Sequence, residues 1–433
     1  MKKISYIIGL FLVCFGSIYA QQTPAKKQTE TILITGATAH IGNGDVITNS
    51  AIGFKDGKLT YVGSAANANK NEYAEVIDAT GKDVYPGFIA LNSTLGLVEI
   101  DAIRQSDDQR EIGEIIPHIR SIIAYNAESK VVESMRPNGI LMAQITPRGG
   151  ILSGTSSIVQ FDAWNWEDAA IKTDDAIHMN WPNPYTRGRW WMGEDAGMKP
   201  NKNYNPEIDK VERFLANAKA YFQGSRTPEN LPFEAVEGLL NGKQKLFVHA
   251  DTEKQIIDAV NFSEKVGLGP IVIVGGYEAH KVGKMLADKK VAVVVTRPHS
   301  MPEHEDEDIK QPYKLAKLLV DQGVLVSLDP SGDMERMSTR NLPFYAGTCV
   351  AYGLDKEKAL SLITSNAAKI LGADDTIGTL EVGKDATLFI SKGDALDMRT
   401  NILSHAFIQG RNISLESHQT QLWKRYMGKY NGK

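Results

Sequence analysis

The middle of the chain alternates between short apolar runs and amphipathic segments, and this alternation limits the possible folds most strongly. One segment, residues 252–266, begins at a capping Thr252 and stops at Gly267, as a helix does. Strand–helix repeats form parallel sheets, and eight strands close a barrel. The pattern therefore predicts an α/β fold, a TIM-type (β/α)8 barrel over residues 85–374 with an insertion at about 182–240. Its strands are expected at 84–91, 139–145, 157–162, 175–181, 245–250, 270–275, 291–296 and 324–329.

The two terminal segments are rich in short strand-like runs and lack helical periodicity. Residues 31–84 include the tetrapeptide Lys55–Lys58, where Asp-Gly supplies the positive φ that a tight hairpin turn needs. Residues 375–433 begin with similar runs and end in a tail. Neither segment is large enough to enclose its own core. We therefore expect the two to form one composite β-sandwich domain that flanks the barrel.

Residues 1–30 have the composition of a targeting and leader sequence. Lys2 and Lys3 precede an apolar run at 7–15, and small residues follow it at a plausible cleavage site. The apolar run is too short to span a bilayer. We therefore expect residues 1–20 to be a cleaved signal peptide, with an exported, periplasmic protein that keeps no stable membrane anchor. Residues 21–30 are polar and are expected to form a flexible leader.

Charge and cysteine content exclude some classes of partner and bond. The chain carries a formal charge of -4 and no basic cluster, so no nucleic acid partner is expected. One of its two cysteines, Cys14, lies in the predicted signal peptide. The mature chain then keeps only Cys349 and cannot form an internal disulfide. Cys349 is expected to be a buried, small apolar residue.

Three residues near the carboxyl ends of predicted strands are candidates for chemistry, because such positions converge on one site in a barrel of this type. His178 and His249 are candidate metal ligands, and Asp329 is a candidate general base. Structural alternatives stay open for all three. A histidine on a buried strand can be a core residue, which we favour for His178, and an aspartate before Pro330 also suits a turn.

A glycine- and serine-rich segment, TPRGGILSGTSS at 146–157, follows the second predicted strand. As a loop it would expose backbone N–H groups that could bind a carboxylate or another anion beside the Arg148 guanidinium. Arg148, Ser153 and Thr155 are therefore candidate substrate-binding residues. The alternative is a tight loop that needs glycine for its backbone alone.

Five of the six tryptophans lie between Trp164 and Trp191, near the start of the predicted insertion. Such a cluster can form the wall of a substrate pocket or an oligomer interface. Packing of the inserted segment is the third explanation, and we favour it.

Four stretches of the chain resemble the amidohydrolase superfamily, in particular its exported imidazolonepropionase-like branch. They read ILITGATAHIGNGDVI, IDATGKDVYPGFIALN, LFVHADTEKQI and ALSLITSNAAKILGADDTIGTLEVGKDATLFI. The resemblance covers most of the mature chain. It implies a metal-bearing barrel beside a β-sandwich, and hydrolysis of C–N bonds in amides, cyclic amides or dipeptides by a metal-bound hydroxide.

The metal ligands of that family match this chain only in part. The strand-one pair of histidines falls on Asn92 and Thr94, and the strand-six histidine falls on Gly275 or Gly276. Amide and hydroxyl side chains are poor zinc ligands. The strand-five histidine falls on His249. The resemblance therefore does not extend to the two-metal site that the superfamily builds.

The remaining family positions match approximately. The strand-eight aspartate, which takes the proton of the attacking water, corresponds to Asp329, with Asp333 a register shift away. The bridging lysine of strand four has no secure counterpart, although Lys172 and His178 lie nearby. At most one divalent metal is then expected at His249 and His178, and zinc is the first choice. The alternative is a site without metal.

Two functional hypotheses follow. The first is an exported amidohydrolase-like enzyme that hydrolyses amide, cyclic amide or dipeptide C–N bonds at a reduced metal site. The second is a non-catalytic protein on the same fold, which binds such a ligand or acts as a partner subunit. As an oligomer it would pair with itself or with a catalytic relative.

Overall fold

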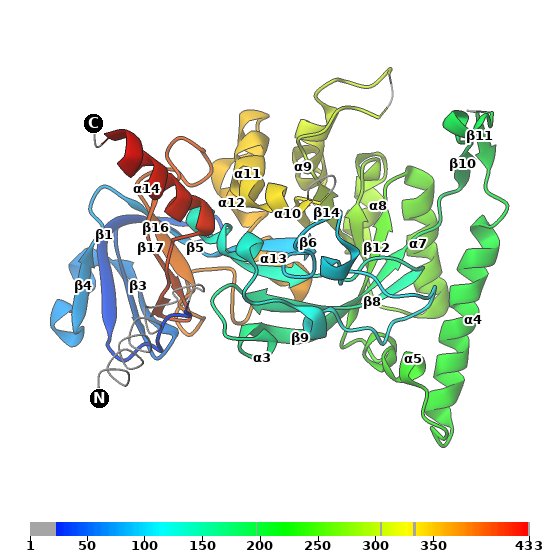
Figure 1. The fold of residues 1–433 in the computed structure, drawn as a ribbon, viewed down its shortest axis with the longest axis horizontal. Helices are drawn as coiled ribbons and strands as arrows, with labels where there is room; N and C mark the ends of the chain where they lie inside the picture. The colour runs from blue at the N-terminus through cyan, green and yellow to red at the C-terminus, as the bar shows by residue number, and fades with distance from the viewer. Residues whose placement is uncertain (1–22, 196, 304, 332–334, 432–433) are drawn as a thin grey trace, which may run out of the picture.

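The computed structural model describes residues 23–195, 197–303, 305–331 and 335–431. The predicted signal peptide and Asp333 lie outside the described residues. A strand-rich domain built from both ends of the chain lies beside a central barrel, and the inserted segment projects from the opposite side of the barrel (Figure 1). Among the described residues, no helix combines the length and the apolar character needed to cross a bilayer.

All eight predicted barrel strands are present. They form one sheet, in which the last strand lies beside the first, so that the barrel is nearly closed. In chain order the strands are β6 (Phe88–Ser93), β7 (Ile140–Ile145), β8 (Leu152–Gln160), β9 (Ala170–Asn180), β12 (Lys245–Ala250), β13 (Val272–Gly275), β14 (Ala292–Thr296) and β15 (Val326–Asp329).

The third barrel strand runs opposite to the others. β8 pairs antiparallel with both β7 and β9, whereas the other neighbouring strands pair in parallel. The expectation of eight parallel strands is therefore wrong at β8. Only residues 146–151 connect β7 to β8, and a parallel crossover needs about a dozen residues or more. The short connection forces a hairpin, and β8 itself occupies the second half of the segment expected to be a glycine-rich loop, residues 152–157.

Helices cover the second half of the barrel in the expected strand–helix order. The predicted cap at Thr252 is present as a capping box, with Thr252 and Gln255 bonded to each other's backbone, and Gly267 ends this helix in the left-handed conformation. The elements are α7 (Glu253–Val266), η7 (Ala279–Lys281), α8 (Gly283–Asp288), α9 (Gln311–Asp321), α10 (Glu335–Ser338), η8 (Thr339–Asn341), α11 (Leu342–Ala351), α12 (Lys356–Ser361) and α13 (Ser365–Leu371).

Irregular structure covers the first half of the barrel. The chain between β6 and β7 bridges to β8 at Ile115 and Arg120 and so lies against that strand. Its helices are short: η3 (Arg104–Ser106), η4 (Ser121–Ala124), α2 (Lys130–Glu133) and η5 (Arg136–Asn138), and α3 (Trp166–Ala169) precedes β9.

The barrel interior is apolar at one end and polar at the other. The apolar end contains Leu91 on β6, Ala176 on β9 and Phe247 on β12, and Ile370 of α13 packs into the same cluster. Side chains two residues further along a strand face the same side of the sheet. The next inward positions on β9 and β12 are therefore His178 and His249, at the carboxyl end.

Both ends of the chain contribute to one further sheet, which confirms the predicted composite domain. The sheet curls onto itself, since Phe54 and Phe407 lie on strands far apart in the sheet order, yet their ring centroids are 5.1 Å apart. The predicted Asp-Gly turn is present between β2 and β3, with positive φ at both residues. The strands are β1 (Ile32–His40), β2 (Val46–Lys55), β3 (Lys58–Ser64), β4 (Glu75–Asp78), β5 (Asp83–Pro86), β16 (Leu388–Ser391), β17 (Leu403–Ile408) and β18 (Arg411–Asn412). Two short helices, η1 (Ala65–Asn67) and η2 (Lys70–Glu72), follow β3.

Residues 23–30, within the predicted leader, have no regular secondary structure but make specific contacts. The backbone N–H of Ala25 donates to Asp162 at 2.9 Å, and Gln28 bonds to Phe54 O and to Gly57 N–H. At the other end of the chain, α14 (His418–Asn431) begins where His418 N–H donates to Glu133 of α2.

The insertion exposes part of the tryptophan cluster. Trp181 is buried and packs against Phe262 of α7, but Trp190 and Trp191 are 70% and 67% exposed. Packing of the insertion therefore does not explain the last two tryptophans. The inserted elements are β10 (Tyr185–Arg187), η6 (Trp190–Met192), β11 (Met198–Pro200), α4 (Tyr204–Gln223), α5 (Leu231–Glu234) and α6 (Glu237–Leu240).

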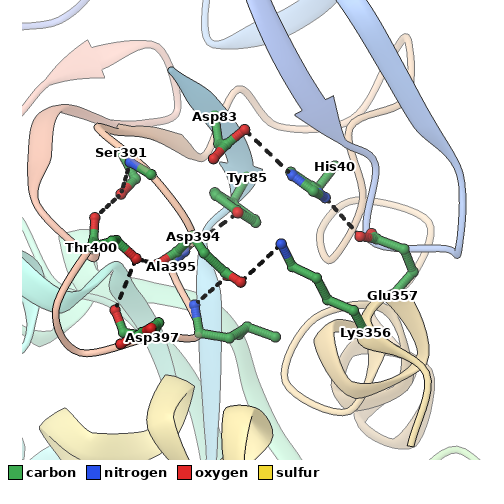
Figure 2. A network of polar contacts seen from close by, with 12 residues as sticks. His40, Asp83, Tyr85, Lys356, Glu357, Ser391, Asp394, Ala395, Asp397 and Thr400 are labelled. Carbon is green, nitrogen blue, oxygen red and sulfur yellow. Dashed lines mark hydrogen bonds and ion pairs between the residues drawn. The ribbon is translucent and has the colours of Figure 1, made fainter. Parts of the chain in front are cut away.

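A histidine links the sandwich to the barrel (Figure 2). His40, at the end of β1, lies between Asp83 of β5 and Glu357 of α12, at 3.7 and 2.8 Å. Its ring stacks on Tyr85 with centroids 4.5 Å apart. Burial lowers the pKa of His40, but the two carboxylates outweigh burial and raise it above the ordinary value. A charged His40 thus stabilises this interface. A second ion pair, between Lys356 and Asp394, lies beside it.

Candidate functional site

The polar end of the barrel centres on Asn92, the next-to-last residue of the first barrel strand, β6. Its side chain is 2% exposed, and its φ of 49° lies in the left-handed region that asparagine tolerates better than most residues. This backbone turn directs the carboxamide to Asp329 on the neighbouring β15, where Nδ2 donates to Oδ2 at 2.7 Å. Asn92 therefore fills a position where the resemblance would put a metal-binding histidine.

Arg148 completes this part of the site from the β7–β8 connection. Its guanidinium donates to Asn92 Oδ1 at 2.8 Å and to the Asn92 backbone oxygen at 2.7 Å. Two donors to one residue fix the planar guanidinium in place. The structure thus places Arg148 beside Asn92, whose side chain and backbone orient it. A substrate-binding role for Arg148 stays a prediction.

Asp329 is fully buried and accepts several hydrogen bonds. Besides Asn92, the backbone N–H and the hydroxyl of Ser331 donate to its carboxylate at 2.7 and 2.5 Å. Thr296 of β14 lies 3.5 Å away. Hydrogen bonds to the charged form of a carboxylate stabilise that form. The arrangement suits an ionised Asp329, and its role as a general base stays a prediction.

The two predicted histidines meet. His178 Nδ1 lies 3.2 Å from His249 Nε2, and the His178 Nε2 atom lies 3.0 Å from Ser156 Oγ. Burial and the charge of Arg148 lower the pKa of His249 to about 3. Burial, His249 and Arg148 also lower the pKa of His178 well below its ordinary value. Both imidazoles are therefore neutral near pH 7.

Three further polar residues, which sequence reasoning missed, lie beneath the histidines. Ser156 of β8 donates to Asp175 at 2.8 Å, and Gln144 of β7 donates to Asp175 at 2.8 Å and to Ser156 at 3.1 Å. Burial raises the pKa of Asp175 to about 6. The signal was a polar residue inside an apolar strand, as in ILMAQI at 140–145.

The other two predicted substrate-binding residues lie in strand β8. Thr155 donates to Pro117 O at 2.7 Å, so it holds the segment that covers the outside of the strand. Ser153 accepts a hydrogen bond from Asn180 at 3.1 Å. Both side chains are buried. The expectation of an anion-binding loop is therefore wrong for Ser153 and Thr155, because both lie in strand β8 and their hydroxyls bond to other parts of the protein.

The side chains present do not fit the metal site of the family. At Gly275, φ is +100° and an added Cβ would lie 2.3 Å from Asp251 Oδ1, so no histidine can replace it unless Asp251 moves. Lys172 Nζ donates to the backbone of Leu371 and Gly372 and so faces the opposite end of the barrel. Within the described ranges, no group of three or more His, Cys, Asp or Glu side chains could hold a metal ion.

Comparisons with known proteins agree with the barrel and sandwich fold. The amidohydrolase family model matches residues 318–414. Two imidazolonepropionases, from Clostridium tetani and Shouchella clausii, are 22% and 21% identical, and each match covers 84% of this chain and 90% and 86% of the relative. An amidohydrolase structure from Thermotoga maritima matches with a TM-score of 0.76 and 25% identity, over 88% of this chain and 99% of that one. These matches support the amidohydrolase superfamily, and within it the imidazolonepropionase-like branch, for this chain.

The matches to amidohydrolases agree with the barrel and sandwich and confirm the resemblance seen in the sequence. A Xaa-Pro dipeptidase structure shares the fold, with a TM-score of 0.55 at 13% identity. The relatives support hydrolysis of C–N bonds as the class of reaction. In the site of this chain, Asn92 and Arg148 lie beside Asp329.

Proposed function

We propose that this protein binds a small amide, cyclic amide or dipeptide-like ligand at the carboxyl end of the barrel, without turnover by a metal-bound hydroxide. The hydrogen bond of 2.7 Å from Asn92 Nδ2 to Asp329 Oδ2 carries this proposal. Through this bond the neutral carboxamide of Asn92 donates to Asp329, the proposed general base, and Arg148 holds the carboxamide in place. A cation beside Asp329 would have to displace this contact and lie near the guanidinium charge.

The chemistry of the site suits an amide better than a purely apolar ligand. Arg148 supplies a positive charge and N–H donors for a carbonyl or carboxylate oxygen. His249 is a neutral imidazole and supplies a hydrogen-bond acceptor or donor, depending on its tautomer. Arg148 lies near enough to lower the pKa of His249 by its charge, and a donor and an acceptor in one site would match the C=O and N–H of an amide.

Calorimetry with defined probes tests ligand binding. We would titrate hydantoin, N-acetylglycinamide and Gly-Pro into the wild-type protein and into Arg148→Gln. We expect at least one probe to bind and its affinity to fall about tenfold or more in the variant, which corresponds to about 1.4 kcal/mol. Arg213→Gln, which changes an exposed arginine on α4, is the matched control and should bind as wild type does. Equal affinity in Arg148→Gln would refute this ligand site.

A reduced metal-dependent hydrolase is the second candidate function. The adjacency of two neutral imidazoles, with His178 Nδ1 3.2 Å from His249 Nε2, favours it, since neutral imidazole is a good zinc ligand. In this alternative, His178 and His249 would hold one divalent metal, zinc first, and Asp329 would be the general base. The metal would supply an activated water.

Metal analysis separates the two candidates. The protein would be purified without chelator, assayed for zinc, iron and manganese, and incubated with the same amide and dipeptide probes. Under the binding proposal we expect well below one metal per chain and no hydrolysis. Stoichiometric metal that is lost in His249→Ala, together with probe hydrolysis, would establish the hydrolase and overturn the binding proposal.

The protein is further proposed to be exported, on the strength of the charged start and apolar run of residues 1–20. Expression in a Gram-negative host and N-terminal sequencing of the periplasmic fraction test this. We expect the mature chain to begin at Gln21. A full-length chain that stays in the cytoplasm would contradict export.

Pairing of the protein with itself or with a catalytic relative stays part of the proposal. Sedimentation of the purified protein would report self-association.

A further inference from the structure

The hydrogen-bond chain beneath the histidines has a direction that can be derived from its ends. The backbone N–H of Asn92 can only donate, so the atom of Gln144 that it meets at 3.2 Å is the carbonyl oxygen Oε1. The amide nitrogen of Gln144 then faces the other way, toward Asp175 and Ser156. One backbone group thus fixes the orientation of the Gln144 amide.

Ser156 passes this direction on to the histidines. Its hydroxyl has one proton, and Asp175 Oδ1 at 2.8 Å is its shortest acceptor. Gln144 Nε2 donates to the same hydroxyl oxygen at 3.1 Å. The remaining lone pair of Ser156 Oγ therefore accepts from His178 Nε2, which lies 3.0 Å away. His178 then carries its proton on Nε2, and its Nδ1 is left as an acceptor.

The second histidine follows from the first. His178 Nδ1, as an acceptor, requires a proton on His249 Nε2, 3.2 Å away. A neutral imidazole has one N–H, so His249 Nδ1 is unprotonated. Among the described residues, His249 makes no other side-chain hydrogen bond. Its ring is only partly buried. Its Nδ1 is thus available to a ligand.

We propose that Asp175 is a positioning residue that, acting through Ser156, holds His178 and His249 in the Nε2–H tautomer and leaves His249 Nδ1 as a hydrogen-bond acceptor in the site. The carboxylate reaches Ser156 because β9 bulges: Ser156 pairs with Ala176, but Ile158 pairs with Lys172. The bulge residue Asp174 has a φ of 53°. Bulges are typical of strands that redirect a side chain.

The opposite direction requires a donor at residue 175. In Asp175→Asn, the carboxamide oxygen would accept from Gln144 and its nitrogen would donate to Ser156. Ser156 would then donate to His178 Nε2, and the proton of His178 would move to Nδ1. His249 Nε2 would then accept a hydrogen bond from His178 Nδ1–H, and His249 would carry its own proton on Nδ1. The substitution thus converts His249 Nδ1 from an acceptor into a donor.

This tautomer adds a specificity for the ligand, a consequence that rests on the proposed function. An unprotonated Nδ1 binds an N–H group, such as that of an amide, and is repelled by a carboxylate oxygen. Arg148 has only donors, so it binds an oxygen atom and is repelled by an N–H group. Arg148 and His249 Nδ1 together would therefore favour an amide, which offers both C=O and N–H, over a carboxylate, which offers only oxygen acceptors.

Nitrogen NMR of the ligand-free protein tests the tautomers directly and needs no ligand, so its failure is distinct from a failure of ligand binding. The chain would be labelled with 15N-histidine, and the resonances of His178 and His249 would be assigned by their loss in His178→Gln and His249→Gln. At about pH 8, above the raised pKa of Asp175 of about 6, the carboxylate is ionised. We expect protonated Nε2 and unprotonated Nδ1 on both rings.

Two variants complete the test. Asp175→Asn should exchange the protonated and unprotonated nitrogens of both histidines, whereas Asp174→Asn should leave them unchanged. Asp174 is the matched control, since it is the neighbouring aspartate and pairs with Arg120 at 2.8 Å instead. A wild-type spectrum with the proton on His249 Nδ1 would overturn the proposal even if Asp175→Asn does not fold. An Asp175→Asn spectrum identical to that of wild type would overturn it as well.

Discussion

At the scale of single residues, Asn92 decides what this barrel end can do. Its carboxamide both donates to Asp329 and accepts from Arg148, which a histidine ring cannot do with the same geometry. The site is therefore a satisfied polar network. Under the binding proposal, Asn92 takes part in hydrogen bonds with Asp329 and Arg148 where a metal ligand would otherwise lie.

Removal of the Asn92 carboxamide should cost stability. Asn92→Ala leaves the buried Asp329 carboxylate with one donor fewer and removes the Oδ1 atom to which Arg148 donates. We expect a loss of about 1–3 kcal/mol in the free energy of unfolding, measured by urea denaturation. Asn71→Ala, an exposed asparagine in η2, should change it by less than about 0.5 kcal/mol. Equal effects of the two substitutions would show that the network adds nothing.

At the scale of elements, the sandwich and the barrel meet through side chains that respond to pH. His40 lies between Asp83 and Glu357, and its raised pKa means that folding favours its protonated form. The contribution to stability is full below the unfolded-state pKa of about 6.5 and is lost as pH rises through the higher folded-state pKa. The interface is therefore stronger in mildly acidic solution.

The pH dependence of this interface can be measured by denaturation at about pH 6 and about pH 8.5, on either side of the histidine range. The fall in unfolding free energy between the two should be smaller in His40→Gln than in wild type, because glutamine has no proton to lose. His418→Gln, at the exposed start of α14, should keep the wild-type difference. An unchanged fall in His40→Gln would contradict a charged His40.

The inserted hairpin is an element whose apolar side chains do not support the fold. Trp190 and Trp191 contact each other edge to face and are mostly exposed. The double variant Trp190→Ser/Trp191→Ser should change the free energy of unfolding by less than about 0.5 kcal/mol. Trp181→Ser, by contrast, removes a ring that is 5% exposed and should cost about 3–5 kcal/mol. Denaturation of the three proteins would compare them, and a large loss in the double variant would mean that the hairpin packs on the body.

At the scale of the whole molecule, one aromatic cluster joins the two ends of the chain to the barrel. Phe389 of β16 packs on Tyr85 of β5 and on Phe88 of β6, with ring centroids 5.5 and 4.9 Å away. β16 also pairs with β5. The sandwich thus depends on a strand from the C-terminal part of the chain, and the sandwich and the barrel share a core.

Phe389→Ala should therefore destabilise both domains together. The loss of a buried phenylalanine typically costs about 3–5 kcal/mol. We expect a single unfolding transition shifted to lower denaturant by both circular dichroism and tryptophan fluorescence. Trp423→Ala, which changes an aromatic residue that is 63% exposed on α14, is the control and should hardly move the transition. Two separate transitions in Phe389→Ala would show that the domains fold independently.

The sequence by itself determined much of the architecture and part of the site. Strand positions followed from apolar runs, the capped helix α7 from Thr252 and Gly267, and the composite domain from short strands at both ends. The absence of strand-one histidines was visible at Asn92 and Thr94. These features depend on local composition and spacing, which a single chain displays directly.

Only the tertiary structure decided the rest. The direction of β8 depends on a short connection whose geometry the apolar pattern does not reveal. The chain from Asp175 through Ser156 to His178 depends on a bulge in β9 and on the pairing of two strands. The exposure of Trp190 depends on how far the hairpin projects. Each of these is a relation between segments, and side chains far apart in sequence acquire a hydrogen-bond direction only when the fold brings their atoms within about 3 Å.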